Sequence, residues 1–161
     1  MSLPKDWGPP LWKILHIYTE HIGFQTNELL STDEIRAFIH FLKSLEFAMP
    51  CAKCRAHYKR WKTAKPVDQF IHYRGVYLRQ VVREWLWGLH NDVNRENGLV
   101  SPPLETISET YSAFCRADLQ NSIKDCTTSF QKAMEHSLVG YEAIKKFRLT
   151  LSFLNRLINF A

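Results

Sequence analysis

A C-x-x-C pair, Cys51 and Cys54, carries the clearest chemical signal in the sequence. The pair directly follows Pro50 and opens a predicted helix, where unpaired backbone N–H groups and the helix dipole stabilise a thiolate at Cys51. Lys53 and Arg55 add positive charge nearby. Because a thiolate is the species that attacks a disulfide, the pair has the properties that thiol–disulfide exchange requires.

Two other interpretations of this pair remain open from the residues alone. Cys51 and Cys54 have the spacing of half a zinc site, and His57 follows three residues later. With nearby histidines they would make a non-enzymatic, helical zinc-binding interaction module. The two thiols would alternatively be buried and inert. A thioredoxin-type strand–helix–strand setting is missing, so redox chemistry would have to occur on a helical scaffold.

The other two cysteines, Cys115 and Cys126, lie eleven residues apart. We expect a disulfide between them, closing a loop between the fifth predicted helix and the C-terminal segment. A relay of electrons to the C-x-x-C pair and two reduced thiols are the alternatives, and spacing does not choose among them.

A second group of side chains is suited to a flat, heteroaromatic ligand. Trp12 and His16 lie four residues apart, on one face of the first predicted helix. Packed against the fourth predicted helix, this face would line a cleft with aromatic rings and hydrogen-bonding groups. A dithiol whose electrons end on oxygen requires such a bound cofactor. The group comprises Trp7, Trp12, His16, Trp85, His90, Asn91, Val93 and Asn94.

The elements that position these residues are predicted to be helices. Apolar residues recur at three- and four-residue spacing over residues 9–22, 32–49 and 73–97. Bounding prolines place two shorter helices at residues 51–63 and 104–117. Pro9 and Pro10 suit the first turn of the first helix, and Ser31 or Thr32 suits the cap of the second. No strand-like alternation or hairpin dipeptide stands out. The sequence therefore predicts an all-α fold.

The C-terminal segment differs from the rest of the chain. Residues 127–161 contain no proline, and apolar residues from Leu138 to Ile158 again recur at helical spacing. We expect a single amphipathic helix that packs on the core or on a second subunit. The chain thus divides into a helical domain of residues 1–117 and a helical extension of residues 118–161.

Composition narrows the classes of function. The 161 residues are 45% hydrophobic and 13% aromatic, which excludes disorder for most of the chain. The net charge of +5 is mild, so we expect no nucleic-acid partner. No apolar run approaches the roughly 18 residues of a membrane span, and the N-terminal residues lack the apolar stretch of a secretory signal. We therefore expect a cytoplasmic location.

Three motifs together resemble the Erv/ALR family of FAD-linked sulfhydryl oxidases. These are Trp7-Gly8 with Trp12 and Leu15-His16, the Pro50-Cys51-Ala52-Lys53-Cys54 step, and residues 85–94, which read W-L-W-G-L-H-N-D-V-N. Their order and spacing agree with the family over about residues 7–98. The compact chain, with one redox pair and an added helical segment, is most similar to the variants of large DNA viruses.

The resemblance implies a four-helix bundle that holds FAD at its end, a short fifth helix and a homodimer. It implies that Cys51 exchanges with protein dithiols and that Cys54 contacts the flavin, with oxygen reduced to hydrogen peroxide. A viral enzyme of this kind would act in the host cytoplasm or the virion. The implied FAD contacts are Trp7, Gly8, Trp12, His16, Cys54, Trp85, His90, Asn91, Val93 and Asn94.

The sequence departs from the family pattern at three places. Met49 stands where many members have tyrosine, and Leu99 follows Gly98 where many have a lysine that meets the cofactor phosphates. The basic residues available to replace that lysine are Lys62, Lys65 and Arg95. No cysteine lies between Cys54 and Cys115, so the family's common disulfide between the third and fourth helices is absent.

Overall fold

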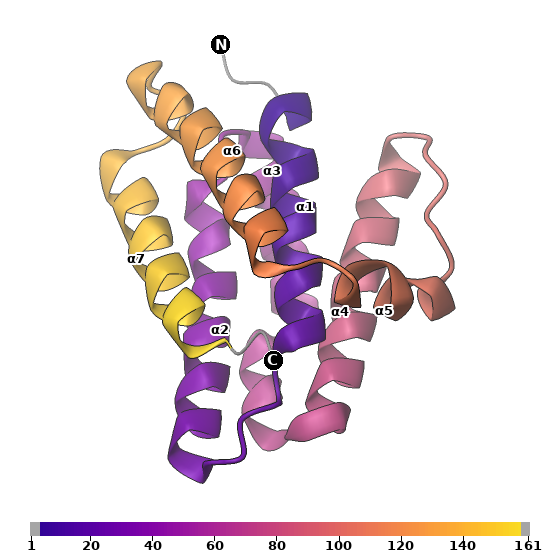
Figure 1. Ribbon diagram of the computed structural model, residues 1–161. Helices are drawn as coiled ribbons and strands as arrows, with labels where there is room; N and C mark the ends of the chain where they lie inside the picture. The colour runs from indigo at the N-terminus through magenta and orange to yellow at the C-terminus, as the bar shows by residue number, and fades with distance from the viewer. Residues whose placement is uncertain (1–3, 159–161) are drawn as a thin grey trace.

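Helices make up most of residues 4–158, the part of the chain that the computed structural model describes. No strand occurs in this part, so the predicted all-α class is confirmed (Figure 1). The elements are α1 (Pro4–His21), α2 (Glu28–Ala48), α3 (Ala52–Ala64), the 3-10 helix η1 (Val67–His72), α4 (Gly75–Glu96), α5 (Leu104–Ser112), α6 (Arg116–Glu135) and α7 (Tyr141–Leu157).

Two helices, α1 and α2, organise the packing. Helix α1 contacts α4, α5 and α6, whereas α2 contacts α3, η1 and α7. In Figure 1 the yellow α7 runs beside the violet α2, and the orange α6 runs beside the indigo α1. None of the described helices is both long enough and apolar enough to cross a bilayer.

Helix α1 begins five residues earlier than predicted, so Pro9 and Pro10 lie inside it. The reason is tertiary packing: Trp7 is buried and its ring meets Phe130 of α6 edge-on, with centroids 5.8 Å apart. Proline in a helix removes one backbone hydrogen bond. The hydroxyl of Ser129 donates to the carbonyl of Asp6, 3.5 Å away, and so replaces the N–H that Pro10 lacks.

Helix α2 also begins earlier than predicted. Its cap is Asn27, whose side-chain oxygen accepts from the backbone N–H of Leu30 at 3.1 Å. Ser31, expected to cap, is inside the helix and buried. The predicted end before Pro50 is confirmed, because α2 ends at Ala48. Asn27, four residues upstream of Ser31, therefore caps the helix in place of the residues that directly precede the apolar run.

The C-terminal segment forms two helices, so the prediction of a single helix is wrong. Helix α6 ends at Glu135, and a turn containing Ser137, whose φ is 60°, leads to Gly140 at the cap of α7. The expected packing of the apolar stripe is confirmed. Phe147 of α7 lies between Phe41 and Phe130, with ring centroids 5.6 Å and 4.9 Å away. The division of the chain at residue 117 stays a prediction.

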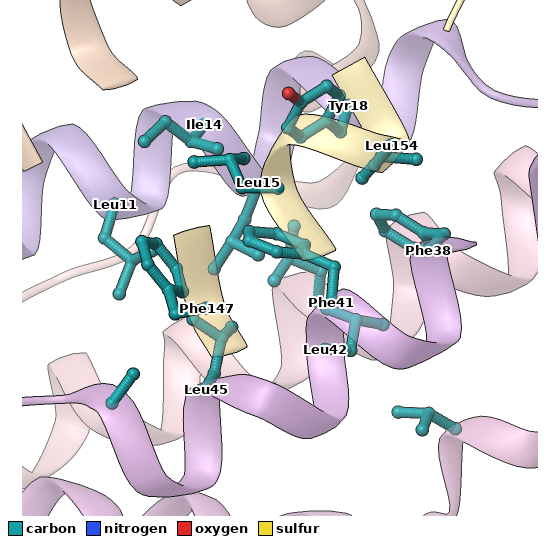
Figure 2. Packing of buried hydrophobic residues seen from close by; sticks show 14 of the residues in the cluster. Leu11, Ile14, Leu15, Tyr18, Phe38, Phe41, Leu42, Leu45, Phe147 and Leu154 are labelled. Carbon is teal, nitrogen blue, oxygen red and sulfur yellow. The ribbon is translucent and has the colours of Figure 1, made fainter. Parts of the chain in front are cut away.

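Figure 2 shows how α7 completes the core. Phe147 and Leu154 of α7 are buried among side chains of α1 and α2, and each such burial stabilises the fold by about 1.5–3 kcal/mol. Their labelled neighbours are Leu11, Ile14, Leu15, Tyr18, Phe38, Phe41, Leu42 and Leu45.

An ion pair joins α1 to α4. Both carboxylate oxygens of the buried Glu20 accept from the guanidinium of Arg83, at 2.8 Å and 2.7 Å. This bidentate geometry is stronger and more directional than a single contact. It holds together the two helices that carry the predicted ligand-binding residues.

Candidate functional site

The Cys51–Cys54 pair lies at the start of α3 as a disulfide, with the Cα atoms 5.1 Å apart. Cys51 caps the helix, and its sulfur accepts from the backbone N–H of Cys54 at 3.2 Å. Both cysteines are only partly buried. The predicted redox pair is thus oxidised, reachable, and placed where a helix N-terminus stabilises the thiolate formed on opening.

His57, one turn into α3, joins the disulfide-bearing helix to α4. Its Nε2 lies 2.8 Å from a carboxylate oxygen of Asp92, and its Nδ1 lies 3.1 Å from one of Glu96. These contacts bring the C-x-x-C helix against the half of α4 that carries residues 90–94. Sequence reasoning considered His57 only as a zinc ligand and missed this role.

The zinc interpretation is not favoured. Cys51 and Cys54 are bonded to each other, whereas zinc requires free thiolates. Among residues 4–158, no group of three His, Cys, Asp or Glu side chains is arranged to hold a metal ion.

A ring cluster forms where α1, α4 and α5 meet. The rings of Trp12 and His90 are stacked, with centroids 3.9 Å apart and planes 5° from parallel. His16 Nε2 lies 3.1 Å from His90 Nδ1, and Tyr111 of α5 stacks on His16 with centroids 4.5 Å apart. The structure thus brings three of the predicted residues together. Tyr111 was missed, although its four-residue spacing from the buried Ile107 places it on the inner face of α5.

Both histidines of this ring cluster are held neutral. Burial lowers the pKa of His16 to about 3, and the nearby His90 contributes. Burial lowers the pKa of His90 to about 4. In the neutral pair one of the two facing nitrogens carries a hydrogen and the other accepts it. The cluster therefore presents flat rings and hydrogen-bonding nitrogens without adding positive charge.

Trp7 and Trp85 have their ring contacts elsewhere. Trp7 packs on Phe130 of α6, as described above. Trp85 meets Tyr58, Trp61 and Phe70 edge-on, and its indole N–H donates to the carbonyl of Lys65 at 2.8 Å. No ring contact joins either tryptophan to the described cluster of Trp12, His16 and His90.

The remaining predicted residues lie along the surface of α1 and α4. A Cβ built on Gly8 would meet nothing within 4 Å, so the space beside it is open. Asn91, Val93 and Asn94 are half-buried on the last turns of α4. The amide of Asn94 donates to the hydroxyl of Ser101 at 2.8 Å and so holds the following loop.

Buried polar atoms near these helices fit a polar, flat ligand such as FAD. His16 Nδ1 and the indole nitrogen of Trp61 are buried, and neither has a hydrogen-bond partner among the described residues. Such unpaired groups cost about 1–3 kcal/mol each. A Cβ on Gly88 would lie 2.9 Å from the Trp61 ring, so this glycine lets Trp61 approach α4. The residues present therefore suit a heteroaromatic group with polar edges.

The three basic candidates for a phosphate contact differ in their surroundings. Lys62 forms an ion pair with Glu46, so its charge is already neutralised. The ammonium of Lys65 lies 4.1 Å from the centre of the Trp61 ring. Arg95 is exposed, and its ion pair with Asp92 is a longer one, at 3.6 Å, which leaves the guanidinium accessible. Lys65 and Arg95 therefore remain the better candidates.

The expected bond between Cys115 and Cys126 is wrong, because both thiols are free. Cys115 caps α6 and Cys126 lies on the same helix, which separates their Cα atoms by roughly 16 Å at a rise of about 1.5 Å per residue. A disulfide needs less than about 7 Å. Burial raises the pKa of the Cys126 thiol to about 12, which also makes it a poor relay.

Comparison with known proteins gives one family and several viral relatives. Residues 9–112 match the Erv1 / Alr family. A protein named FAD-linked sulfhydryl oxidase from African swine fever virus (isolate Pig/Kenya/KEN-50/1950) is 27% identical over 89 residues, which cover 55% of this chain and 66% of the relative. The putative FAD-linked sulfhydryl oxidase 096R of Invertebrate iridescent virus 3 is 25% identical over 108 residues, 67% of each chain.

These matches confirm the resemblance to the variants of large DNA viruses. The chain spans just under two thirds of the length of the African swine fever virus relatives. No solved structure matches this chain.

Proposed function

The chain belongs to the Erv1 / Alr family, and from this membership we propose that it is an FAD-dependent sulfhydryl oxidase. It would form disulfide bonds in protein dithiols and reduce oxygen to hydrogen peroxide. The observation that carries the proposal is the placement of the Cys51–Cys54 disulfide at the start of α3, joined through His57 to the α4 segment of residues 90–94.

The first exchange begins at Cys51. A substrate thiolate attacks the sulfur of Cys51, the Cys51–Cys54 bond breaks, and Cys54 leaves as a thiolate. The second substrate thiolate then attacks the substrate sulfur of the mixed disulfide, and Cys51 leaves as a thiolate. The backbone N–H of Cys54 already points at the Cys51 sulfur, so the helix start stabilises this leaving group. The substrate loses two electrons, which the C-x-x-C pair gains.

FAD, when bound, would supply the acceptor for these two electrons and the chemistry for their transfer to oxygen. We assign the contact with the flavin to Cys54. Trp12, His16 and His90 would hold the cofactor, because they offer flat rings and neutral nitrogens in one place. The unpartnered His16 Nδ1 would gain a hydrogen bond there.

Six further residues complete the proposed FAD contacts: Trp7, Gly8, Trp85, Asn91, Val93 and Asn94. The open space beside Gly8 and the half-buried positions of Asn91, Val93 and Asn94 support the inclusion of these four. Trp7 and Trp85 are buried, and their inclusion rests on the family motif. Lys65 or Arg95 would meet the phosphates in place of the lysine that many members have.

The partners that we propose are protein dithiols, molecular oxygen and a second copy of the chain as a homodimer. We also propose a cytoplasmic location, in the host cell or the virion. Residues 118–161 would form an extension of the oxidase domain, with α7 packed on its core.

The visible spectrum of the purified protein tests the proposal. We expect a yellow protein with the absorbance bands of oxidised flavin, which bleach when dithiothreitol is added without oxygen and return with air. Hydrogen peroxide should form in step with oxygen consumption. A colourless protein with one bound zinc ion and no oxygen consumption would contradict the proposal and support the interaction module.

A further inference from the structure

An open pocket of about 560 Å³ lies beside the start of α3. Its walls come from the end of α2, from Arg55 of α3 and from the turn between α6 and α7, which lies toward the same end of the bundle as the end of α2 (Figure 1). Phe47 and Tyr141 line it and remain more than half exposed. Leu138 and Val139 add further apolar surface from the turn.

A smaller pocket of about 160 Å³ continues this surface along α7. The two pockets share Met134 and Tyr141, so they are adjacent. The smaller one is bordered by Lys145 and Arg148, and the larger one by Arg55. The side chains lining the two pockets include these three cations and no carboxylate. The combined surface therefore carries apolar side chains among polar groups, with a basic border.

Arg55 ties this surface to the active disulfide. Its guanidinium donates to the carbonyl of Met49 and, at 3.4 Å, to the carbonyl of Leu138 in the α6–α7 turn. The Met49 carbonyl also accepts from the backbone N–H of Cys51 at 2.8 Å. The turn is thus fixed against the same backbone step that presents Cys51.

On the basis of the proposed oxidase function, we propose that the two pockets form the docking site of the protein substrate. The occupant is a polypeptide segment that carries the dithiol, an apolar side chain beside it, and acidic residues further along the chain. The apolar side chain would cover Phe47, Leu138 and Tyr141. The acidic residues would lie against Lys145 and Arg148, where opposite charge favours encounter and fixes register.

The docking site predicts a preference that a small dithiol cannot show. Dithiothreitol reaches Cys51 without side chains to place in either pocket, so it reports the chemistry alone. Two dithiol peptides of equal length test the site: in both, leucine adjoins the first cysteine, and the residues after the second are either glutamates or lysines. We expect a higher kcat/KM for the acidic peptide, through a lower KM.

Matched variants separate this site from general surface charge. Lys145→Glu with Arg148→Glu reverses the basic border, whereas Lys146→Glu changes an exposed neighbour that lines neither pocket. The double variant should lower the ratio of kcat/KM for the acidic peptide to that for the basic peptide by about tenfold or more. The ratio for Lys146→Glu should stay at the value of the unmodified chain, with melting temperatures confirming the fold of both.

A binding measurement keeps the two proposals distinguishable. The acidic peptide with serine in place of its cysteines should bind the unmodified chain and the Lys146→Glu variant, and bind the double variant at least about tenfold more weakly. Absence of oxygen consumption with dithiothreitol would defeat the oxidase function and leave this binding result intact. Normal oxidation of dithiothreitol with equal use of both peptides, or equal peptide binding by all three proteins, would overturn the docking site.

Discussion

Trp12 of α1 and His90 of α4 stack face to face, with ring centroids 3.9 Å apart and ring planes 5° from parallel. The contact links the first and fourth helices at the point where His16 and Tyr111 add two further rings. Both histidines are neutral, because burial lowers their pKa values to about 3 and about 4. If FAD binds here as proposed, the stability of this region and its affinity for the cofactor would depend on the same side chains.

Removing either partner of the stack should weaken FAD binding. We expect His90→Ala and Trp12→Ala each to raise the Kd for FAD by at least about tenfold, equivalent to about 1.4 kcal/mol, because stacking area and a buried polar contact are lost together. Fluorescence titration of flavin-free protein measures this. Trp87→Phe is a control on the same helix, since the Trp87 indole contacts Pro102 outside the ring cluster. An unchanged Kd in both alanine variants would mean that FAD does not bind at this ring cluster.

Acid should destabilise the protein through the same histidines. Their folded-state pKa values lie below the usual 6.5, so the unfolded chain binds protons first as the pH falls below that value. Stability is then lost from about pH 6.5 down to about pH 4 for His90 and about pH 3 for His16, by at most about 1.4 kcal/mol per pH unit for each. His90→Gln should reduce the fall in melting temperature between pH 7 and pH 5, measured with equal added FAD. An identical fall in both proteins would contradict the buried, neutral state of His90.

Glu34 should lower the stability of the protein as the pH rises, whereas the two histidines lower it as the pH falls. Burial raises its pKa to about 7, and its carboxyl accepts from the backbone N–H of Gly23 at 2.7 Å. The folded state retains this proton above the ordinary carboxyl value, so the associated stability is complete below about pH 4.5 and is lost as the pH rises through 7. Glu34→Gln keeps the accepting oxygen and removes the titration.

The melting temperature of Glu34→Gln relative to the unmodified chain should therefore rise between pH 5 and pH 8, by the equivalent of about 1–2 kcal/mol. Asp33→Asn, at the exposed neighbouring position, should show no such trend. A constant difference across this pH range would mean that Glu34 is ionised throughout.

The helices that the sequence predicted best are those with strong local stop signals. Pro50 ends α2 and Gly98, with a φ of 68°, follows α4. The misplaced start of α1 has a tertiary cause, because burial of Trp7 against α6 extends the helix through Pro9 and Pro10. No local pattern around the prolines could report that contact.

Apolar spacing, which located most of the helices, did not reveal the break between α6 and α7. Leu138 and Tyr141 continue the helical spacing through the turn, whereas both are exposed in the structure. The positive φ of Ser137 is not expected from a serine. The predicted disulfide between Cys115 and Cys126 is wrong for a related reason, because residue spacing does not show that both cysteines belong to one helix. The contacts of Tyr111 and His57 required the packed helices.

The C-x-x-C pair should be essential, and the other two cysteines should not. Cys51→Ser and Cys54→Ser each remove one of the two sulfurs that exchange requires, so oxygen consumption with dithiothreitol should fall to background while bound FAD remains. Cys115→Ser and Cys126→Ala should retain oxidation of both dithiothreitol and a folded protein dithiol, because the two thiols are not bonded and Cys126 is buried. If these variants kept oxidation of dithiothreitol but lost oxidation of the folded protein dithiol, the result would contradict this prediction and support a relay through Cys115 and Cys126.

The C-terminal helix should contribute to the stability of the oxidase fold. Phe147 is fully buried between Phe41 and Phe130, so Phe147→Ala would leave a cavity among three helices and should lower the free energy of unfolding by about 3–5 kcal/mol. Leu149→Ala, two residues away with a side chain that is 69% exposed, should change it by less than about 0.5 kcal/mol. Urea unfolding of both variants measures the difference. Equal stability of the two variants would show that α7 is an appendage and not part of the core.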